Sequence, residues 1–505
     1  MKIKPVVLII RDGWGYRADK KNNTIAMGKT PNTDKLMKNY PHILLSATGE
    51  AVGLPKGYQG NSEVGHMTIG TGRIIPQFLV RINQSIEDKT FFHNLAFLGA
   101  IQNCKKHKTK LHLIGLLQTE GVHSHIDHLF ALLDLCKKEQ FYNVYTHIIT
   151  DGRDAPVTAS IEKIKKLQKK IRKLGFGIIA TVSGRYYAMD RDKNWDRTQR
   201  VYDCIIRARA GEYSDIVKQI QECHKKEETD EFIVPRKLVG YSGVDKNDSI
   251  IFYNFRTDRP RQLTQAIIEK KFEGWTRIRP DVYFVAMTEF YDSIKTPIAF
   301  VDIPLKNLLG ETISRHGLKQ LRISETEKYM HITFFFNGCK DAPYKNEKRI
   351  LIPSPRVATY DLKPEMSIFE ITNKLLQKID EEKYNFIVVN LVNGDMIGHT
   401  GVLEAGLRAV EVVDECVGKI TSKVLEKDGY ALVSADHGNI EDQGPKWNTS
   451  HTLNKVSFIL VSQKGKELKL HKKGGLQDIA PTVLDLLNIK KPHEMSGDSL
   501  IKKNK

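Results

Sequence analysis

Side chains that commonly bind metal ions lie near both ends of this 505-residue sequence. They are carboxylates and imidazoles, joined by one serine in a glycine-containing loop: Asp12, Ser62, Asp395, His399, Asp436, His437 and His451. Asp395 and His399 are four residues apart, so they share one face if that stretch is helical and could bind one ion. A mixture of carboxylate and imidazole without thiolates suits Mn²⁺ or Zn²⁺ and argues against a structural zinc site.

Each of these features has an ordinary explanation when it is taken alone. A pair spaced like Asp395 and His399 is more often a surface ion pair or a helix cap. The segment Asp436-His437-Gly438 is more often a turn, and Ser62 in its Gly/Asn loop would usually be a turn residue. The joint occurrence of these residues after predicted strands is what favours a metal site.

A second group of polar residues occupies the middle of the chain and is mostly basic. Its members are His123, Arg153, Asp154, Arg185, Arg191, Arg256 and Arg259. Arginines at the ends of strands suit the bidentate capture of carboxylate and phosphate groups. The alternative is that each arginine pairs with a neighbouring aspartate in a structural network, and for any single arginine this alternative is at least as strong.

Short apolar, β-branched runs alternate with helical periodicity, which predicts an α/β fold with largely parallel sheets. The predicted strands are Val6–Ile10, Thr146–Thr150, Ile178–Val182, Ile250–Asn254, Val282–Ala286, Phe386–Leu391 and Ala431–Ser434. Apolar spacing predicts helices over Ile161–Leu174, which Gly175 would end, and through Val410–Val424. Several strands lead directly into polar, glycine-containing segments, and ligand sites in open α/β sheets lie at the carboxyl ends of strands.

The order of the two residue groups along the chain predicts a discontinuous domain. The metal-type residues lie in the first and last parts of the sequence, and the arginines lie between them. We therefore expect one domain from 1–75 and 305–505, a second domain inserted at 78–297, and linkers near 71–77 and 298–304. The active site would then lie in the cleft between the two domains.

Several short segments together resemble the cofactor-independent phosphoglycerate mutases, members of the alkaline phosphatase superfamily. They are Asp12–Gly15, Gly60–His66, Gly121–His125, Asp151–Asp154, Gly184–Asp192, Glu325–Tyr329, Asp395–His399, Asp436–Asn439 and Ser450–Thr452. The resemblance runs nearly end to end. It implies an alkaline-phosphatase-like domain with a second α/β domain inserted. One departure is Gln118-Thr119-Glu120, which usually reads Ser, Asp and Gly in relatives.

The resemblance implies the interconversion of 2-phosphoglycerate and 3-phosphoglycerate in glycolysis or gluconeogenesis, without a 2,3-bisphosphoglycerate primer. It also implies two divalent metal ions, usually Mn²⁺, with Zn²⁺ or Co²⁺ as alternatives. One ion would be bound by Asp395, His399 and His451, and the other by Asp12, Ser62, Asp436 and His437. Residues that would bind the substrate are His123, Arg153, Asp154, Arg185, Arg191, Arg256, Arg259 and Lys328.

Ser62 is the predicted nucleophile of a two-step relay, because the two hydroxyl oxygens of one glycerate cannot both be in line with phosphorus. A bound cation lowers the pKa of a serine hydroxyl, and Lys328 would neutralise charge on the transferring oxygens. Asp154 would be acid to the leaving hydroxyl and base to the returning one. The arginines would retain the glycerate, so that water does not take the phosphoryl group.

The nearest alternative is another two-metal phosphatase, sulfatase or phosphomutase of the same superfamily, which the metal-type residues alone do not exclude. The middle arginines favour a mutase, since a hydrolase has no reason to retain its leaving alcohol. A basic nucleic-acid-binding protein is the alternative from a different class, because the net charge is +18. We favour a lysine-biased surface instead, since no nucleic-acid-reading motif accompanies the charge.

Composition argues against disordered, membrane-spanning and secreted proteins. With 40% hydrophobic residues the chain is not mainly disordered, and no apolar run approaches the roughly 20 residues of a membrane helix. No signal-peptide pattern is present, and the six cysteines form no C-x-x-C pair, so we expect reduced thiols and a cytoplasmic location. The expected partner is a small-molecule substrate, with no nucleic acid or membrane, and the resemblance points to a monomer.

Overall fold

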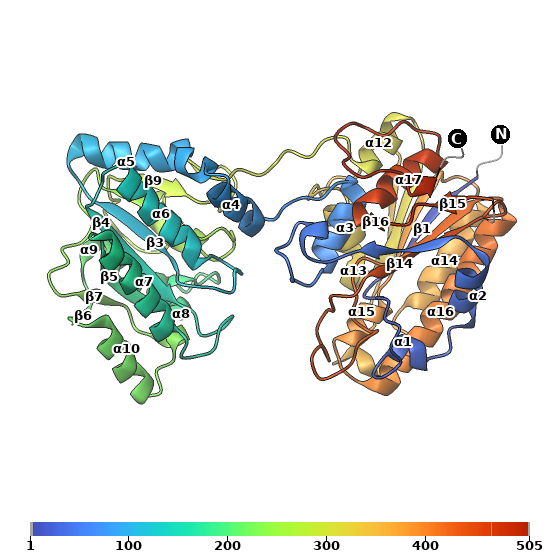
Figure 1. Ribbon diagram of the computed structural model, residues 1–505, viewed down its shortest axis with the longest axis horizontal. Coiled ribbons are helices and arrows are strands. Elements are labelled where there is room, and N and C mark those ends of the chain that lie inside the picture. Colours follow the sequence, from blue (N-terminus) through green and yellow to red (C-terminus); the bar gives the residue numbers. More distant parts are fainter. Residues whose placement is uncertain (1–3, 466, 503–505) are drawn as a thin grey trace. The chain divides into compact units, whose positions relative to one another are not determined.

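The structure is a computed structural model that describes residues 4–465 and 467–502. The chain forms two compact units, one of residues 1–77 and 304–505 and the other of residues 78–303 (Figure 1). Each unit contains one large sheet covered by helices, and most neighbouring strands in both sheets are parallel. The predicted two-domain α/β architecture with largely parallel sheets is therefore confirmed.

The sheet of the first unit has the order β11-β10-β12-β1-β13-β14-β2-β16. Its strands are β1 (Val6–Arg11), β2 (His42–Ser46), β10 (Gln320–Glu325), β11 (Glu347–Ile352), β12 (Phe386–Leu391), β13 (Tyr430–Ser434), β14 (Val456–Val461) and β16 (Gly474–Gly475). Only the β13–β14 and β14–β2 pairs are antiparallel among the strand pairs of residues 4–465 and 467–502 in this sheet. All six residues of β1 are buried, as expected for a central strand covered on both faces.

Two groups of helices cover this sheet, and Figure 1 shows the sheet between them. α2, α14 and α16 pack together in one group, and α3, α12 and α17 form the other. The helices of this unit are α1 (Thr24–Met27), α2 (Pro31–Asn39), α3 (Ser62–Thr71), α12 (Leu309–Arg315), α13 (Thr326–Met330), α14 (Ile368–Asp380), α15 (Asn393–Gly398), α16 (Leu403–Glu426) and α17 (Ile479–Leu486). The helix predicted through Val410–Val424 is α16, and its valine stripe is buried.

The sheet of the second unit has the order β6-β7-β5-β4-β3-β8-β9, and β5–β7 is the antiparallel pair. Its strands are β3 (Leu111–Leu116), β4 (Val144–Thr150), β5 (Ile178–Gly184), β6 (Gly211–Tyr213), β7 (Arg236–Leu238), β8 (Ser249–Phe252) and β9 (Tyr283–Ala286). Along β8, Ile250 and Phe252 pack in one apolar cluster and Ile251 packs in another. Because successive strand residues point to opposite faces, both faces of this sheet are buried.

Helices from different parts of the second unit supply these two clusters. The cluster of Ile251 receives α4 (Phe78–Glu87), α5 (Leu95–His107), α6 (Ile126–Lys138), α7 (Ser160–Leu174) and α10 (Ile216–Lys225). The other receives α8 (Arg185–Ala188), α9 (Trp195–Arg207) and α11 (Arg261–Ile268). The predicted helix Ile161–Leu174 is α7, and Gly175 ends it in the left-handed conformation. Within residues 4–465 and 467–502, every helix is too short or too polar to cross a bilayer.

In both units, polar residues follow the carboxyl ends of neighbouring parallel strands. In the first unit, Asp12 follows β1, Asp436 follows β13, and α15 with Asp395 follows β12. In the second unit, Asp151 follows β4 and Arg185 follows β5. Because such ends meet at one edge of a sheet, the fold gathers these side chains at that edge.

Candidate functional site

Ser62 is the first residue of α3 and lies in a buried polar cluster of the first unit. Asn61 caps this helix by accepting a hydrogen bond from the backbone N–H of Val64. Ser62 Oγ lies 2.9 Å from His437 Nε2 and donates to Asp12 Oδ1 at 3.2 Å. The serine is only 6% exposed. Its place at a helix N-terminus favours negative charge on or near its oxygen.

Three buried carboxylates and one buried lysine surround this serine. Lys328 Nζ lies 2.5 Å from Ser62 Oγ, 2.6 Å from Asp395 Oδ2 and 2.9 Å from Asp12 Oδ1. Burial acts to lower the pKa of Lys328, but Asp12, Asp395 and Asp436 raise it further than burial lowers it, so the ammonium stays charged. One ammonium group does not balance three carboxylates, and buried charges need compensation.

The surrounding charges shift the pKa values of Asp12 and Asp395 in opposite directions. Burial raises the pKa of Asp12, and the negative charge of Asp436 raises it further. Burial also acts on Asp395, but Lys328 and His399 outweigh it and hold the pKa of Asp395 well below its usual range. Asp436 Oδ2 is buried, and the imidazole of His66 lies 3.1 Å from it. The cluster therefore has an excess of negative charge, which bound cations would offset.

Three imidazoles of this cluster are fixed in one tautomer by main-chain carbonyls. Each Nδ1 faces a carbonyl oxygen: Thr449 O at 2.8 Å from His399, Gly60 O at 2.8 Å from His451 and Gly438 O at 3.3 Å from His437. A hydrogen on Nδ1 would leave Nε2 of each ring able to bind a cation, which is the arrangement found in metal-binding histidines.

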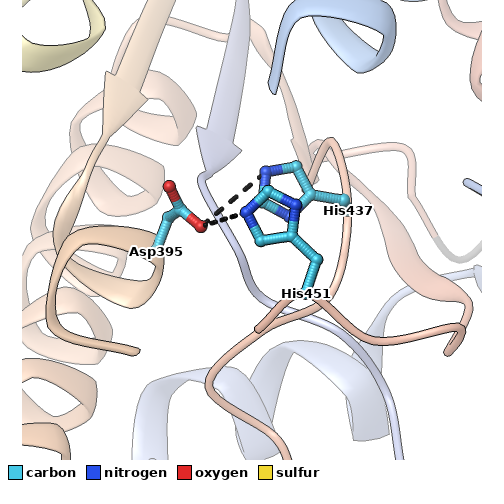
Figure 2. A group of neighbouring side chains, drawn as sticks. All are labelled: Asp395, His437 and His451. Atoms are coloured by element: carbon cyan, nitrogen blue, oxygen red, sulfur yellow. Dashed lines mark ion pairs between the residues drawn. The ribbon is translucent and has the colours of Figure 1, made fainter. Parts of the chain in front are cut away.

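The Nε2 atoms point toward one another and toward Asp395. His399 Nε2 and His451 Nε2 are 3.1 Å apart, and each is 3.2 Å from Asp395 Oδ1. Figure 2 shows the carboxylate of Asp395 facing the imidazoles of His437 and His451, with the Asp395–His437 contact at 3.9 Å. Nitrogen and oxygen atoms this close need a proton or a cation between them, and the contact with Asp395 accordingly raises the pKa of His399.

These residues fit a divalent metal site. Two triplets have ligand atoms that all lie within 4.8 Å of one another, one of Asp395, His437 and His451, the other of Asp12, Asp436 and His437. His437 belongs to both triplets. Oxygen and nitrogen ligands of this kind suit Mn²⁺, Zn²⁺ and similar ions.

The cluster also contains polar residues that the sequence did not single out. His66 Nδ1 lies 2.9 Å from Ser62 O and 3.1 Å from Asp436 Oδ2, and Asn390 Nδ2 donates to Asp12 Oδ2 at 2.7 Å. Asn439 Nδ2 donates to Asp395 Oδ1 at 2.8 Å. His66 and Asn439 lie in segments that carry the family resemblance, which was a usable signal. Asn390 lies inside the apolar strand β12, where no pattern marks it.

In the second unit, Arg185 contacts two of the other predicted residues, Asp154 and His123, and also Asp151. It is 2% exposed, and its Nη1 lies 2.6 Å from Asp151 Oδ1 and 2.5 Å from Asp154 Oδ2. Its Nη2 donates to His123 Nε2 at 3.1 Å, so His123 carries its hydrogen on Nδ1. Burial, Arg185 and Arg256 lower the pKa of His123 to about 4. His123 is therefore neutral at pH 7.

One buried hydrogen-bond donor of this group has no partner among the described residues. His123 Nδ1 is buried and makes no hydrogen bond with the described residues. Because Arg185 holds Nε2 as an acceptor, Nδ1 is a donor, and a buried donor without a partner is costly. An anionic ligand would satisfy it.

Three further arginines of the group pair with acidic side chains. Arg191 Nη1 donates to Asp258 Oδ2 at 2.9 Å, and Arg256 Nε lies 3.3 Å from Asp258 Oδ1. Arg153 forms an ion pair with Glu231. These pairs are the structural network that the sequence left open as an alternative, and they place the arginines together at one end of the sheet.

Arg259 has a different environment. Its Nη1 donates to the main-chain oxygen of Met189 at 3.0 Å. Burial lowers the pKa of Arg259, and the neighbouring charges of Arg185, Arg153 and Arg191 lower it further. Three guanidinium groups thus create a positive field around Arg259, which suits an anionic ligand.

The structure brings the predicted residues into two groups, one in each unit. The first group contains Asp12, Ser62, Lys328, Asp395, His399, Asp436, His437 and His451. The second group contains His123, Arg153, Asp154, Arg185, Arg191, Arg256 and Arg259. Lys328, which the resemblance implies as a substrate-binding residue, lies among the metal-type residues.

Comparison with known proteins adds independent information. The chain matches the Metalloenzyme superfamily over residues 4–491. It is 48% identical to a 2,3-bisphosphoglycerate-independent phosphoglycerate mutase of Clostridium botulinum, covering 99% of this chain and 100% of the relative. A second such mutase, from Methanosarcina barkeri, is also 48% identical, with 99% of both chains covered. The solved structure of Leishmania mexicana phosphoglycerate mutase at low cobalt concentration aligns with a TM-score of 0.69 and 27% identity, covering 99% of this chain and 98% of that one.

Proposed function

The chain belongs to the 2,3-bisphosphoglycerate-independent phosphoglycerate mutases of the metalloenzyme superfamily, and from this premise we propose how its two residue groups perform the reaction. The enzyme is an isomerase that interconverts 2-phosphoglycerate and 3-phosphoglycerate. The observation that carries the proposal is the surroundings of Ser62 Oγ, which has an ammonium, an imidazole and a carboxylate within 3.2 Å.

Ser62 is the proposed nucleophile and carries the phosphoryl group between the two half-reactions. Splitting the transfer in this way lets each step have its own in-line geometry. Lys328, which stays charged, would bind the phosphoryl oxygens as negative charge develops on them. The fixed contacts of Ser62 Oγ with Asp12 and His437 support this role, because they hold the oxygen in one orientation.

Divalent ions complete the first group in this proposal. Mn²⁺ is the first candidate, with Zn²⁺ and Co²⁺ as alternatives. One ion would be held by Asp395, His399 and His451, and the other by Asp12, Ser62, Asp436 and His437. When bound, the ions supply positive charge that favours ionisation of the Ser62 hydroxyl and offsets charge on the phosphoryl group. The main-chain acceptors at each Nδ1 support these assignments, because they orient Nε2 toward the carboxylates.

The second group would bind the glycerate and exchange protons with it. Arg256 and Arg259 are proposed to bind the carboxylate, and Arg153, Arg185 and Arg191 to assist. His123 would donate through Nδ1, the buried nitrogen that lacks a partner. Asp154 is the proposed acid to the leaving hydroxyl and base to the returning one. Its contact with Arg185, together with its partial exposure, supports a carboxylate that is oriented yet reachable.

The two-domain arrangement gives these groups separate tasks. Residues 1–75 and 305–505 would provide the phosphoryl-transfer centre, residues 78–297 would bind the glycerate, and 71–77 and 298–304 would act as hinges. Closure would exclude water and keep the glycerate bound while the phosphoryl group is on Ser62. The completeness of each group within its own unit supports this division of labour.

We further propose that the enzyme acts in glycolysis or gluconeogenesis as a cytoplasmic monomer with a small-molecule substrate. Buried, unpaired thiols at Cys104, Cys136, Cys204, Cys223 and Cys416 are compatible with a reducing compartment.

The test is incubation of the purified protein with 3-phosphoglycerate and Mn²⁺, without 2,3-bisphosphoglycerate. We expect 2-phosphoglycerate to form until equilibrium is reached, and no activity after treatment with a chelator. Release of glycerate and inorganic phosphate as the main products would instead identify a phosphatase of the same superfamily.

A further inference from the structure

Gln118 follows β3 and is completely buried in the second unit. Its side-chain Nε2 donates to Asp151 Oδ2 at 2.8 Å and lies 3.5 Å from Asp154 Oδ2. Its Oε1 accepts from the backbone N–H of Val122 at 3.0 Å and of His123 at 2.9 Å. A single amide thus connects the loop that carries His123 with the loop that carries Asp154.

The amide satisfies both sides of this connection, because one side chain carries both a donor and an acceptor. The carboxylate of Asp151 needs a donor, and the two backbone N–H groups need an acceptor. A glutamate at this position would accept from both N–H groups but would repel Asp151. A methionine would fill a similar volume but would leave three buried polar groups without their partner.

Asp151 connects Gln118 to Arg185 and to the loop that carries Asp154. Its Oδ1 accepts from Arg185 Nη1 at 2.6 Å and from the backbone N–H groups of Arg153 and Asp154 at 3.2 and 3.1 Å. Arg185 then contacts Asp154 and His123 directly. Arg185 therefore contacts the side chains of His123 and Asp154, while Gln118, which is fully buried, holds the backbone of His123 and the carboxylate of Asp151.

We propose that Gln118 is a positioning residue that holds His123 and Asp154 in one arrangement, so that glycerate is retained while the phosphoryl group is away from it. This inference rests on the proposed function, because it assigns Gln118 a part in the retention step. The mechanism does not require Gln118 to touch the substrate. A change at this position should therefore affect how the intermediate is partitioned as well as how fast it forms.

The loop that carries Gln118 is also held by contacts that do not involve the Gln118 side chain. We therefore expect variants at this position to keep the loop in place. Glu120 pairs with Lys163 of α7, with both carboxylate oxygens within 3.0 Å of Nζ. Lys163 is 6% exposed, so the lysine half of this pair is shielded from solvent. The main-chain oxygen of Gln118 also accepts from Ile126 N at the start of α6. Both attachments remain when the Gln118 amide is replaced.

The experiment compares Gln118→Met and Gln118→Glu with wild type in the metal-loaded enzyme. The measurements are kcat and KM for 3-phosphoglycerate, the ratio of glycerate released to 2-phosphoglycerate formed, and the pH profile of kcat/KM. For Gln118→Met we expect kcat/KM to fall about 10- to 100-fold, the range for a lost hydrogen bond to a charged group. Its release ratio should rise severalfold. For Gln118→Glu we also expect the limb of the profile that reports the acid–base carboxylate to move to higher pH, since a like charge is added beside it.

Asn103→Leu is the matched control in the same unit. Asn103 Nδ2 donates to Asn247 O at 2.8 Å and to Ser249 Oγ at 3.1 Å, near the start of β8 and away from the pocket. This change also replaces a bridging amide by a hydrocarbon of similar size. It should lower thermal stability while leaving the release ratio and the pH profile unchanged.

A release ratio in Gln118→Met equal to that of Asn103→Leu would overturn the proposal. Gln118→Glu keeps both accepted N–H bonds, so it decides the question if the methionine variant does not fold; an unchanged ratio and profile there would also overturn it. Absence of mutase activity in the wild-type protein would reject the proposed function instead, so the two failures are distinguishable.

Discussion

The two groups of polar residues differ in how their charge is balanced. In the first unit, three buried carboxylates share one ammonium, Lys328, and the Nε2 atoms of His399 and His451 each lie 3.2 Å from Oδ1 of Asp395. In the second unit, Arg153, Arg185, Arg191 and Arg256 each pair with an acidic side chain. The first group therefore needs added cations, whereas the second is nearly balanced and needs an anion only around His123 and Arg259.

This difference indicates which unit depends on metal. Buried like charges destabilise a fold unless they are compensated, so metal should matter for the integrity of the first unit as well as for its chemistry. The second unit can exchange an internal carboxylate contact for one from the substrate. Its integrity should not depend on metal.

The largest expected effect is loss of the nucleophile. Ser62→Ala should lower mutase activity by at least about 10⁴-fold, as for the nucleophiles of other covalent relays, and should abolish phosphoenzyme formation. Turnover is measured by conversion of 3-phosphoglycerate, and the phosphoenzyme by mass spectrometry of the intact protein.

Ser85→Ala is the control for this substitution. Ser85 is a buried serine of α4 whose hydroxyl donates to Ile82 O, and its loss should leave activity near that of wild type. Substantial turnover by Ser62→Ala would remove Ser62 from the mechanism and would make the first group a metal site without a relay.

Removal of metal should affect the two units differently. A chelator should abolish activity, and re-addition of Mn²⁺ at about 100 times its Kd should stabilise the native state by about 2.7 kcal/mol. Hydrogen exchange resolved by segment measures where this happens. Protection should increase around Asp395, Asp436 and His451 and should remain constant around β3 and β4. An equal gain in both units would contradict the comparison.

Removal of one arginine should affect the second group alone. Arg256→Ala should raise KM for 3-phosphoglycerate about tenfold, by loss of a charge-assisted contact, and should increase hydrolysis relative to isomerisation. Metal affinity, measured by calorimetry, should not change. Arg172→Ala on α7 is the surface control. Unchanged kinetics in Arg256→Ala would leave the proposed carboxylate contact without support.

The smallest expected effect concerns an acid beside the first group. Glu325 ends β10, three residues before Lys328, and burial raises its pKa to about 7 from 4.5, the usual value of an exposed glutamate. Between these two pH values the native state keeps a proton that the unfolded chain releases, so the free energy of unfolding falls as pH rises through this window. Glu325→Gln cannot ionise and should be more stable than wild type at pH 8, by up to about 3 kcal/mol.

Glu311→Gln provides a control of opposite sign. Burial acts to raise the pKa of Glu311, but Arg315 and the backbone N–H of Asn307 outweigh it and lower the pKa. Its ionised form therefore stabilises the fold above its unfolded pKa, and the variant should lose stability there. Urea unfolding of both variants at pH 4 and pH 8 measures the two effects. A stability difference between Glu325→Gln and wild type that does not grow with pH would contradict the assignment.

Much of the fold was predictable because buried strands leave continuous apolar runs. Phe386–Leu391 was predicted and observed with the same bounds as β12, and α7 begins one residue before its prediction. β10 was missed because its sequence, QLRISE, contains charged residues. Arg322 is nevertheless fully buried there, with its guanidinium over the rings of Phe336 and Phe386. Such stacking is a tertiary interaction that one sequence does not reveal.

The candidate site was likewise predictable only in part. Residues such as Asp12 and Asp436 were identifiable because their types and positions after strands suggest chemistry. Asn390 and Gln118 were not, since a single amide in an apolar strand or a loop has no pattern of its own. Their importance depends on which groups the fold places opposite them, here Asp12 and Asp151.

The central claim is that Ser62 carries the phosphoryl group while the same glycerate stays bound. It is tested by incubating the enzyme with 3-phosphoglycerate, Mn²⁺ and an excess of ¹⁴C-labelled glycerate, and quenching during the first turnovers. We expect phosphoserine at residue 62 and 2-phosphoglycerate without ¹⁴C. Label in the 2-phosphoglycerate, or phosphate on a different residue, would contradict it.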